Sequence, residues 1–175
     1  MKKYITFQKF YDFSISLIKN HQKHFKNLSK PEQIKFLREN LSKDVLNSYY
    51  EIDEISKEIA NLVESKTTCL KFSTDNMVKN LIEHPEITIK EYENINFYIK
   101  NAEYILKKNK QNLIYFKIDN KIYQFVIKCT KNNNELYLTT FHKASIKQLA
   151  KDMHRYTIIK KDSPDYEDSK YPSVT

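Results

Sequence analysis

Hydrophobic residues recur at helical spacing through the first third of the chain. Between residues 4 and 27 they stand three or four positions apart, which predicts an amphipathic helix. Pro31 opens a second predicted helix, because proline is favoured in the first helical turn. A third long apolar stripe covers residues 42–63. We therefore expect residues 1–65 to form a helical N-terminal unit.

After residue 66 the pattern becomes mixed. A β-prone run at 67–72 precedes a helix that must stop at His84, because Pro85 disfavours helical geometry in the residue before it. Asp119 and Asn120 are residues that tolerate a tight hairpin turn. Strands are predicted at 104–106, 113–118, 121–129, 136–141 and 156–159, and a helix at 145–153. The fold class expected is α+β: a helical N-terminal unit, then a helix with an antiparallel β-meander of about four strands.

Charge is concentrated in the second of three predicted segments, 1–65, 66–160 and 161–175. Residues 66–160 contain 17 Lys and Arg against 9 Asp and Glu, and so carry the whole net charge of +8. Residues 161–175 have the composition of a flexible tail. A basic α+β domain at 66–160 favours a polyanionic partner, although a lysine-rich proteome would give a similar excess.

Composition excludes several classes of site. The chain has no glycine, and glycine-rich phosphate-binding loops need it for close backbone approach. Cys69 and Cys129 are too few and too far apart for a zinc framework, and we interpret them as small buried hydrophobes or, in an exported protein, one bridge. No signal peptide or membrane span is predicted, and we expect a cytoplasmic protein without a metal or cofactor.

Residues 73–92, STDNMVKNLIEHPEITIKEY, and the strand LYLTTFHKAS at 136–145 carry a resemblance. Together they resemble the phage-associated nuclease-like domains of the barnase, EndoU, colicin and RelE (BECR) fold group, over about residues 68–150. In that group a helix ending in a His-Pro pair precedes a meander that closes on a Thr-rich strand. The resemblance implies a metal-independent, toxin-like or phage-borne endoribonuclease that uses the 2′-OH of RNA as nucleophile.

Such a reaction needs a base, an acid and groups that stabilise the charged phosphorane. His84 matches the histidine of the family's motif and is a candidate acid or base. His142 and Thr140, at the end of the third strand of the meander, are the other candidate catalytic residues. Each has an alternative: His84 could merely close its helix, His142 could be a loop residue, and Thr140 could reflect β-propensity alone.

Candidate substrate-binding residues surround this strand. Lys128 and Lys143 could neutralise phosphate, and Tyr123 and Tyr137 could stack on unpaired bases. Thr139 should face solvent by strict alternation, whereas Thr140 would need a bulge or a strand end to reach substrate. The lysines could equally be solvated, and the tyrosines could be cross-strand pairs.

The implied partners are RNA, tRNA included, and a protein inhibitor, immunity protein or antitoxin, with delivery into a target cell if the protein is a toxin. Two other hypotheses stay open. The same basic sheet could bind RNA or DNA without cleaving it, or the protein could be a phage structural or plasmid-maintenance protein that kept the fold without activity. Only the nuclease hypothesis requires a titrating residue at the site.

Overall fold

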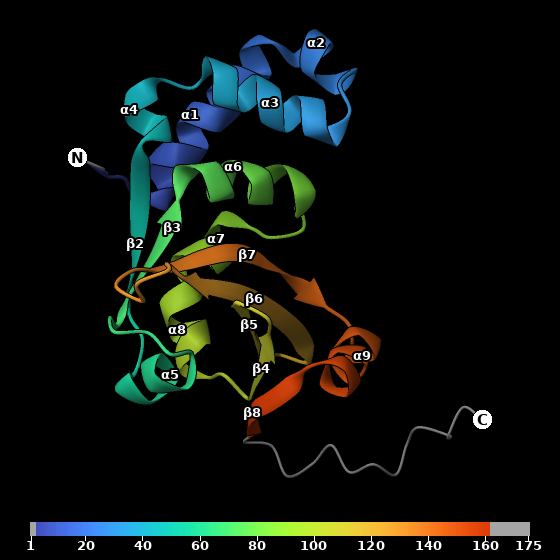
Figure 1. Cartoon of the computed structure of the whole chain (residues 1–175). Coiled ribbons are helices and arrows are strands. Elements are labelled where there is room, and N and C mark those ends of the chain that lie inside the picture. Colours follow the sequence, from blue (N-terminus) through green and yellow to red (C-terminus); the bar gives the residue numbers. More distant parts are fainter. Residues whose placement is uncertain (1–2, 162–175) are drawn as a thin grey trace.

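The computed structural model describes residues 3–161, which form an α+β protein built on one eight-stranded sheet (Figure 1). The strand order is β1-β2-β3-β7-β6-β5-β4-β8. The strands are β1 (Lys3–Tyr4), β2 (Ser48–Glu54), β3 (Cys69–Ser73), β4 (Tyr104–Lys108), β5 (Gln111–Ile118), β6 (Lys121–Cys129), β7 (Leu136–Ala144) and β8 (Thr157–Lys161). The helices are α1 (Phe7–Asn20), α2 (Gln22–Lys26), α3 (Lys30–Asn40), α4 (Lys43–Leu46), α5 (Lys57–Leu62), α6 (Thr74–Glu83), α7 (Ile89–Glu93), α8 (Ile95–Lys100) and α9 (Ile146–Arg155).

The predicted α+β class and the antiparallel meander are confirmed, with β4, β5, β6 and β7 as its consecutive strands. The hairpin between β5 and β6 turns at Asp119 and Asn120, whose φ angles are 48° and 63°. These left-handed values are those that a two-residue hairpin requires, and here Asp and Asn adopt them in place of glycine.

The sheet is larger than the sequence predicts, and one segment was assigned wrongly. Residues 42–63 do not form one helix: β2 separates α4 from α5 and pairs antiparallel with β3. The apolar spacing of this stretch also fits a strand, because Tyr50 and Ile52 lie two apart and Ile52 is buried. The first 65 residues therefore contribute strands as well as helices. The predicted tail at 161–175 lies almost wholly outside the described residues.

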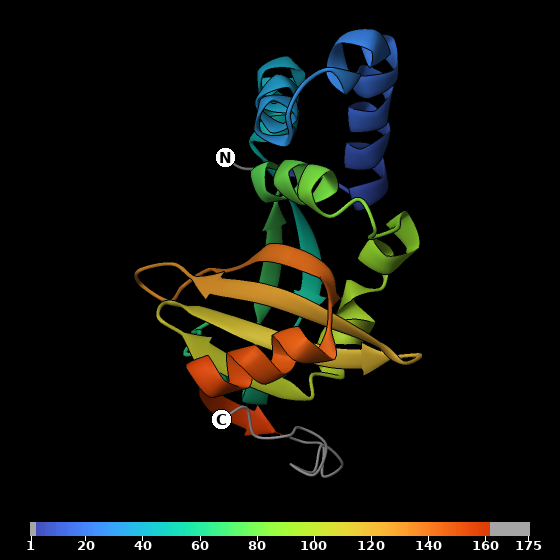
Figure 2. The same ribbon diagram turned by 90° about the vertical axis from the view of Figure 1, so that its right-hand side faces the viewer.

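The two faces of the sheet bury different amounts of apolar surface. The larger core packs one face against α1, α6, α7 and α8, with Phe10, Met77, Tyr92, Phe125 and Phe141 fully buried. The opposite face packs on α9 through Leu149, which contacts a smaller cluster that includes Tyr115 and Ile122. Figure 2 shows α9 crossing in front of this second face. We call it the α9 face.

Helix α6 lies beside β7 and continues the edge of the sheet. β3 pairs with β7 only from Leu136 to Leu138. Beyond that point Asn80 replaces the missing strand: its Nδ2 donates to the carbonyl of Phe141 at 2.8 Å, and the amide of Phe141 donates back to its Oδ1 at 2.8 Å. The side-chain amide thus satisfies two backbone groups that a neighbouring strand would otherwise bond.

Candidate active site

The imidazoles of His84 and His142 stack on each other. Their ring centroids lie 4.8 Å apart and the ring planes differ by 17°. His84 comes from the end of α6 and His142 from β7, so residues 58 positions apart in sequence form one pair. Both residues are candidates from the sequence, and the structure brings them together.

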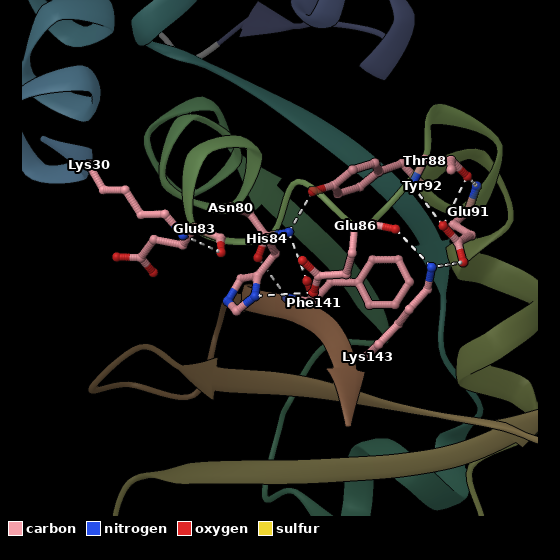
Figure 3. Close-up of polar contacts among 10 residues, drawn as sticks. All are labelled: Lys30, Asn80, Glu83, His84, Glu86, Thr88, Glu91, Tyr92, Phe141 and Lys143. Carbon is pink, nitrogen blue, oxygen red and sulfur yellow. Dashed lines mark hydrogen bonds and ion pairs between the residues drawn. The ribbon is translucent and has the colours of Figure 1, made fainter. Parts of the chain in front are cut away.

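Local sequence explains the position of His84. Ser73 caps α6 by accepting from the amide of Asn76, and the helix ends at its C-cap His84, whose amide donates to the carbonyl of Asn80. Pro85 follows, which prevents the helix from continuing. Figure 3 shows the ring of His84 pointing toward β7, with Glu86 beside it. Nδ1 of His84 lies 3.4 Å from Oε1 of Glu86.

A β-bulge sets the direction of His142. The pairing of β6 and β7 shifts register between Val126 and Ile127, so Thr139 is the extra residue and Thr140 lies opposite Val126. The bulge puts Thr140 and His142 on the α9 face, since Val126 packs against the smaller core there. Thr140 therefore reaches the side of the sheet that carries His142, as the sequence argument required.

Burial defines the electrostatics of His142. It lowers the pKa of this imidazole below its ordinary value, the neighbouring His84 lowers it further, and the carboxylates of Glu86 and Asp152 act in the opposite direction. Nδ1 of His142 is buried, and no residue in the described range 3–161 provides it with a hydrogen bond. A lowered pKa keeps the ring neutral at neutral pH, which is the state that accepts a proton.

Lys143 is held by protein groups next to the histidines. Its Nζ donates to the carbonyl of Glu86 at 2.8 Å and lies 3.4 Å from Oε1 of Glu91 (Figure 3). Although burial acts to raise it, hydrogen bonds from Thr88 and Tyr123 and the charge of Lys143 bring the pKa of Glu91 below its ordinary value. Lys143 therefore ties the segment after α6 to β7 and holds Glu86 near His84.

Tyr123 does not offer a stacking surface, and this corrects the expectation from sequence. Its side chain belongs to the larger core, is 4 % exposed and stacks on Phe116. Its hydroxyl donates to Oε1 of Glu91 at 2.6 Å. Alternation along β6 places Tyr123 on the face opposite α9, because Ile122 and Gln124 occupy the α9 face.

The remaining substrate-binding candidates line a pocket of about 940 Å³ at the end of the sheet. Lys128, Tyr137 and Thr139 all contribute to it, and Lys128 and Tyr137 are direct partners in the β6–β7 ladder. Three more lysines line the same pocket, Lys107, Lys110 and Lys131. Lys107 pairs with Glu64, which also lines it. We call this the lysine pocket.

Two residues that build the site carry no sequence signal. Asn80 binds β7, and Asn76 attaches α6 to β7 by donating to the carbonyl of Leu138. Glu86 is different: a carboxylate two positions after the motif histidine is a candidate from the sequence to orient that ring, and it lies against His84. Nothing in the sequence marks Asn80, because asparagine within a helix ordinarily faces solvent.

No group of three or more His, Cys, Asp or Glu residues that could hold a metal ion is found within residues 3–161. Both cysteines are free thiols, and Cys129 lies 3.4 Å from the carbonyl of Val63. In the described part of the chain, none of the helices has the length and apolar character needed to cross a membrane.

Comparison with protein-family models, curated proteins and solved structures finds no match for this chain.

Proposed function

We propose that this protein is an endoribonuclease that cleaves RNA without a metal ion, by attack of a 2′-OH on the adjacent phosphate. The observation that carries the proposal is the stacking of His84 on His142, at 4.8 Å between centroids, on a basic domain. Two imidazoles at this separation can serve the two proton transfers that the reaction needs. The resemblance of residues 68–150 to the BECR fold group stays a prediction that points the same way.

His142 is the proposed general base. Its lowered pKa keeps it neutral at neutral pH, and because Nδ1 is buried we assign Nε2 as the nitrogen that meets the substrate. In this scheme Nε2 takes the proton of the 2′-OH while the 2′-oxygen forms a bond to phosphorus. His84 then gives a proton to the 5′-oxygen as its bond to phosphorus breaks, leaving a 2′,3′-cyclic phosphate and a free 5′-hydroxyl. Thr140, on the same face, can donate its hydroxyl to the phosphorane oxygens.

The test is incubation of purified protein with total RNA in EDTA. Wild type should produce fragments ending in 2′,3′-cyclic phosphate, and His84→Ala and His142→Ala should each lose at least about a hundredfold in rate. His24→Ala, which changes an exposed histidine on α2, is the matched control and should cleave as wild type does. Intact RNA with wild type, or full activity in the two variants, would overturn the proposal.

A second candidate is nucleic-acid binding without cleavage, and the lysine pocket favours it. Four lysines gather there, and neither histidine of the pair lines it. This candidate predicts binding that weakens steeply with salt and leaves RNA intact. The same incubation, followed by a binding assay at two salt concentrations, separates the two candidates.

An active ribonuclease in the cytoplasm would need an inhibitor. We propose that a partner protein inhibits this one, as an immunity protein or an antitoxin does. The N-terminal helices, which lie at the far end of the molecule from α9, are the surface proposed for delivery or partner binding (Figure 1). A protein whose co-expression relieves the toxicity of the wild type, and does not change the growth of cells that express His84→Ala, would be identified as this partner.

A further inference from the structure

The lysine pocket and the histidine pair lie on the same strand. Tyr137 and Thr139 of β7 line the pocket, and His142 follows farther along the strand. The three-residue step from Thr139 to His142 corresponds to about 10 Å along a strand. A polymer lying along β7 would therefore contact both.

The pocket also opens on the side that carries the histidines. Lys71 faces away from the larger core, because Leu70 and Phe72 point into it, and Tyr137 pairs with Lys71 in the β3–β7 ladder. Lys128, the partner of Tyr137 on β6, shares that side. Tyr137, Lys128 and His142 thus belong to the α9 face, and α6 borders it with Asn76 at the pocket and His84 at the pair.

We propose that the lysine pocket binds a nucleotide of single-stranded RNA close to the cleaved linkage, and that it makes longer strands better substrates than short ones. This inference rests on the proposed function. Phosphates of a stacked strand lie about 3.4 Å apart along its axis and those of an extended strand farther, so the pocket is within about three nucleotides of the reacting phosphate. Lys110 and Lys128 neutralise phosphate, and the half-buried ring of Tyr137 stacks on the base.

Volume and lining both favour a nucleotide. About 940 Å³ is at the upper end of the range for small-molecule sites, which accommodates a base with its sugar phosphate but not a duplex. Asparagines on the turns around the pocket, Asn109 and Asn133, have φ angles of 54° and 57° and bring polar side chains to its rim. Asparagine amides can bond base edges.

The experiment measures cleavage and binding separately. Cleavage is followed with a dinucleotide and with an RNA of about eight nucleotides, within the site sizes of single-strand binders. Binding uses the DNA strand of the same length and sequence, which lacks the 2′-OH and is not cleaved, with the mononucleotide as a second probe. The variants are Tyr137→Leu and the double change Lys110→Gln with Lys128→Gln. The matched control is Lys19→Gln with Lys23→Gln, two exposed lysines on α1 and α2.

We expect each pocket variant to raise the KM of the longer RNA and the Kd of the DNA strand about tenfold, and to raise the KM of the dinucleotide by less. The mononucleotide should bind far more weakly than the strand. If the wild type cleaves RNA but both pocket variants keep its KM for the longer RNA and its Kd for the DNA strand, the pocket proposal is overturned and the nuclease proposal is upheld. If the wild type cleaves no RNA but the pocket variants bind the DNA strand more weakly, the pocket proposal is upheld and the nuclease proposal is overturned. Equal loss in the lysine control would overturn the pocket as well, since it would reflect charge alone.

Discussion

Asn80 and Phe141 exchange two hydrogen bonds of 2.8 Å, one from the side-chain amide to the backbone carbonyl and one in return. Through this contact α6 is fixed to β7 along the edge that β3 does not cover, and the residue after the helix, His84, is brought to His142. The amide of Asn80 also bonds the hydroxyl of Tyr92. The position of the histidine pair therefore depends on one buried side chain outside the pair.

Asn80→Ala should destabilise the protein by about 2–4 kcal/mol, because it leaves the amide and carbonyl of Phe141 buried without partners. Denaturant unfolding measures the change. Asn94→Ala is the control, since Asn94 is an exposed residue that bonds one carbonyl, that of Lys90, and its loss should cost under about 1 kcal/mol. Equal costs for the two variants would contradict the bridging role.

Glu86→Gln should lower kcat about tenfold with little change in KM, because Glu86 orients the ring of His84 and contacts it at 3.4 Å. The control is Glu83→Gln, which removes a carboxylate at the end of α6 that pairs with Lys79, four residues before it on the same helix. Steady-state kinetics of the two variants make the comparison. A kcat of Glu86→Gln equal to that of the control would show that the carboxylate does not position the base or acid.

The stability of the fold should depend on pH through His142. Its pKa in the folded protein lies below the unfolded value of about 6.5, so the unfolded chain binds the proton more tightly. Above about pH 6.5 the ring is neutral in both states, and its contribution to the unfolding free energy is complete. As pH falls toward the folded pKa the unfolded chain is protonated first, and this contribution is lost. The unfolding free energy of wild type should therefore drop more than that of His142→Gln between about pH 8 and about pH 5. Parallel curves would contradict the assignment. Glu91, whose pKa is lowered from 4.5, acts below this window.

Tyr123→Phe should cost about 1 kcal/mol of stability and leave RNA binding unchanged. The change removes the 2.6 Å hydrogen bond to Glu91 and keeps the ring in the core. Thermal unfolding and a binding titration test the two parts. A loss of RNA affinity at full stability would mean that the tyrosine contacts substrate, as its sequence position first indicated.

Local signals predicted much of the fold. Pro85 set the end of α6, the pair Asp119 and Asn120 set the β5–β6 turn, and alternation set the meander. β2 was missed because its apolar spacing suits a helix as well as a strand, and only pairing with β3 decides between them. Non-local pairing of this kind cannot be read from one segment.

The candidate site shows the same limit. His84 and His142 carry chemistry that their residue type reveals, so both could be named in advance. Their stacking depends on the bulge at Thr139 and on the bonds of Asn80, which are set by packing between distant elements. Tyr123 and Tyr137 are the same residue type on neighbouring strands, yet one is in the core and the other lines the pocket. Only the register of the sheet distinguishes them.

The coupling of the two histidines is the most direct test of the account. Single-turnover cleavage of one RNA in EDTA is measured for wild type, His84→Ala, His142→Ala and the double variant. Groups that act together in one reaction are strongly non-additive, so we predict that each single change removes about a hundredfold or more and that the double variant is little slower than either. Intact RNA with wild type, or losses that multiply in the double variant, would contradict the proposed active site.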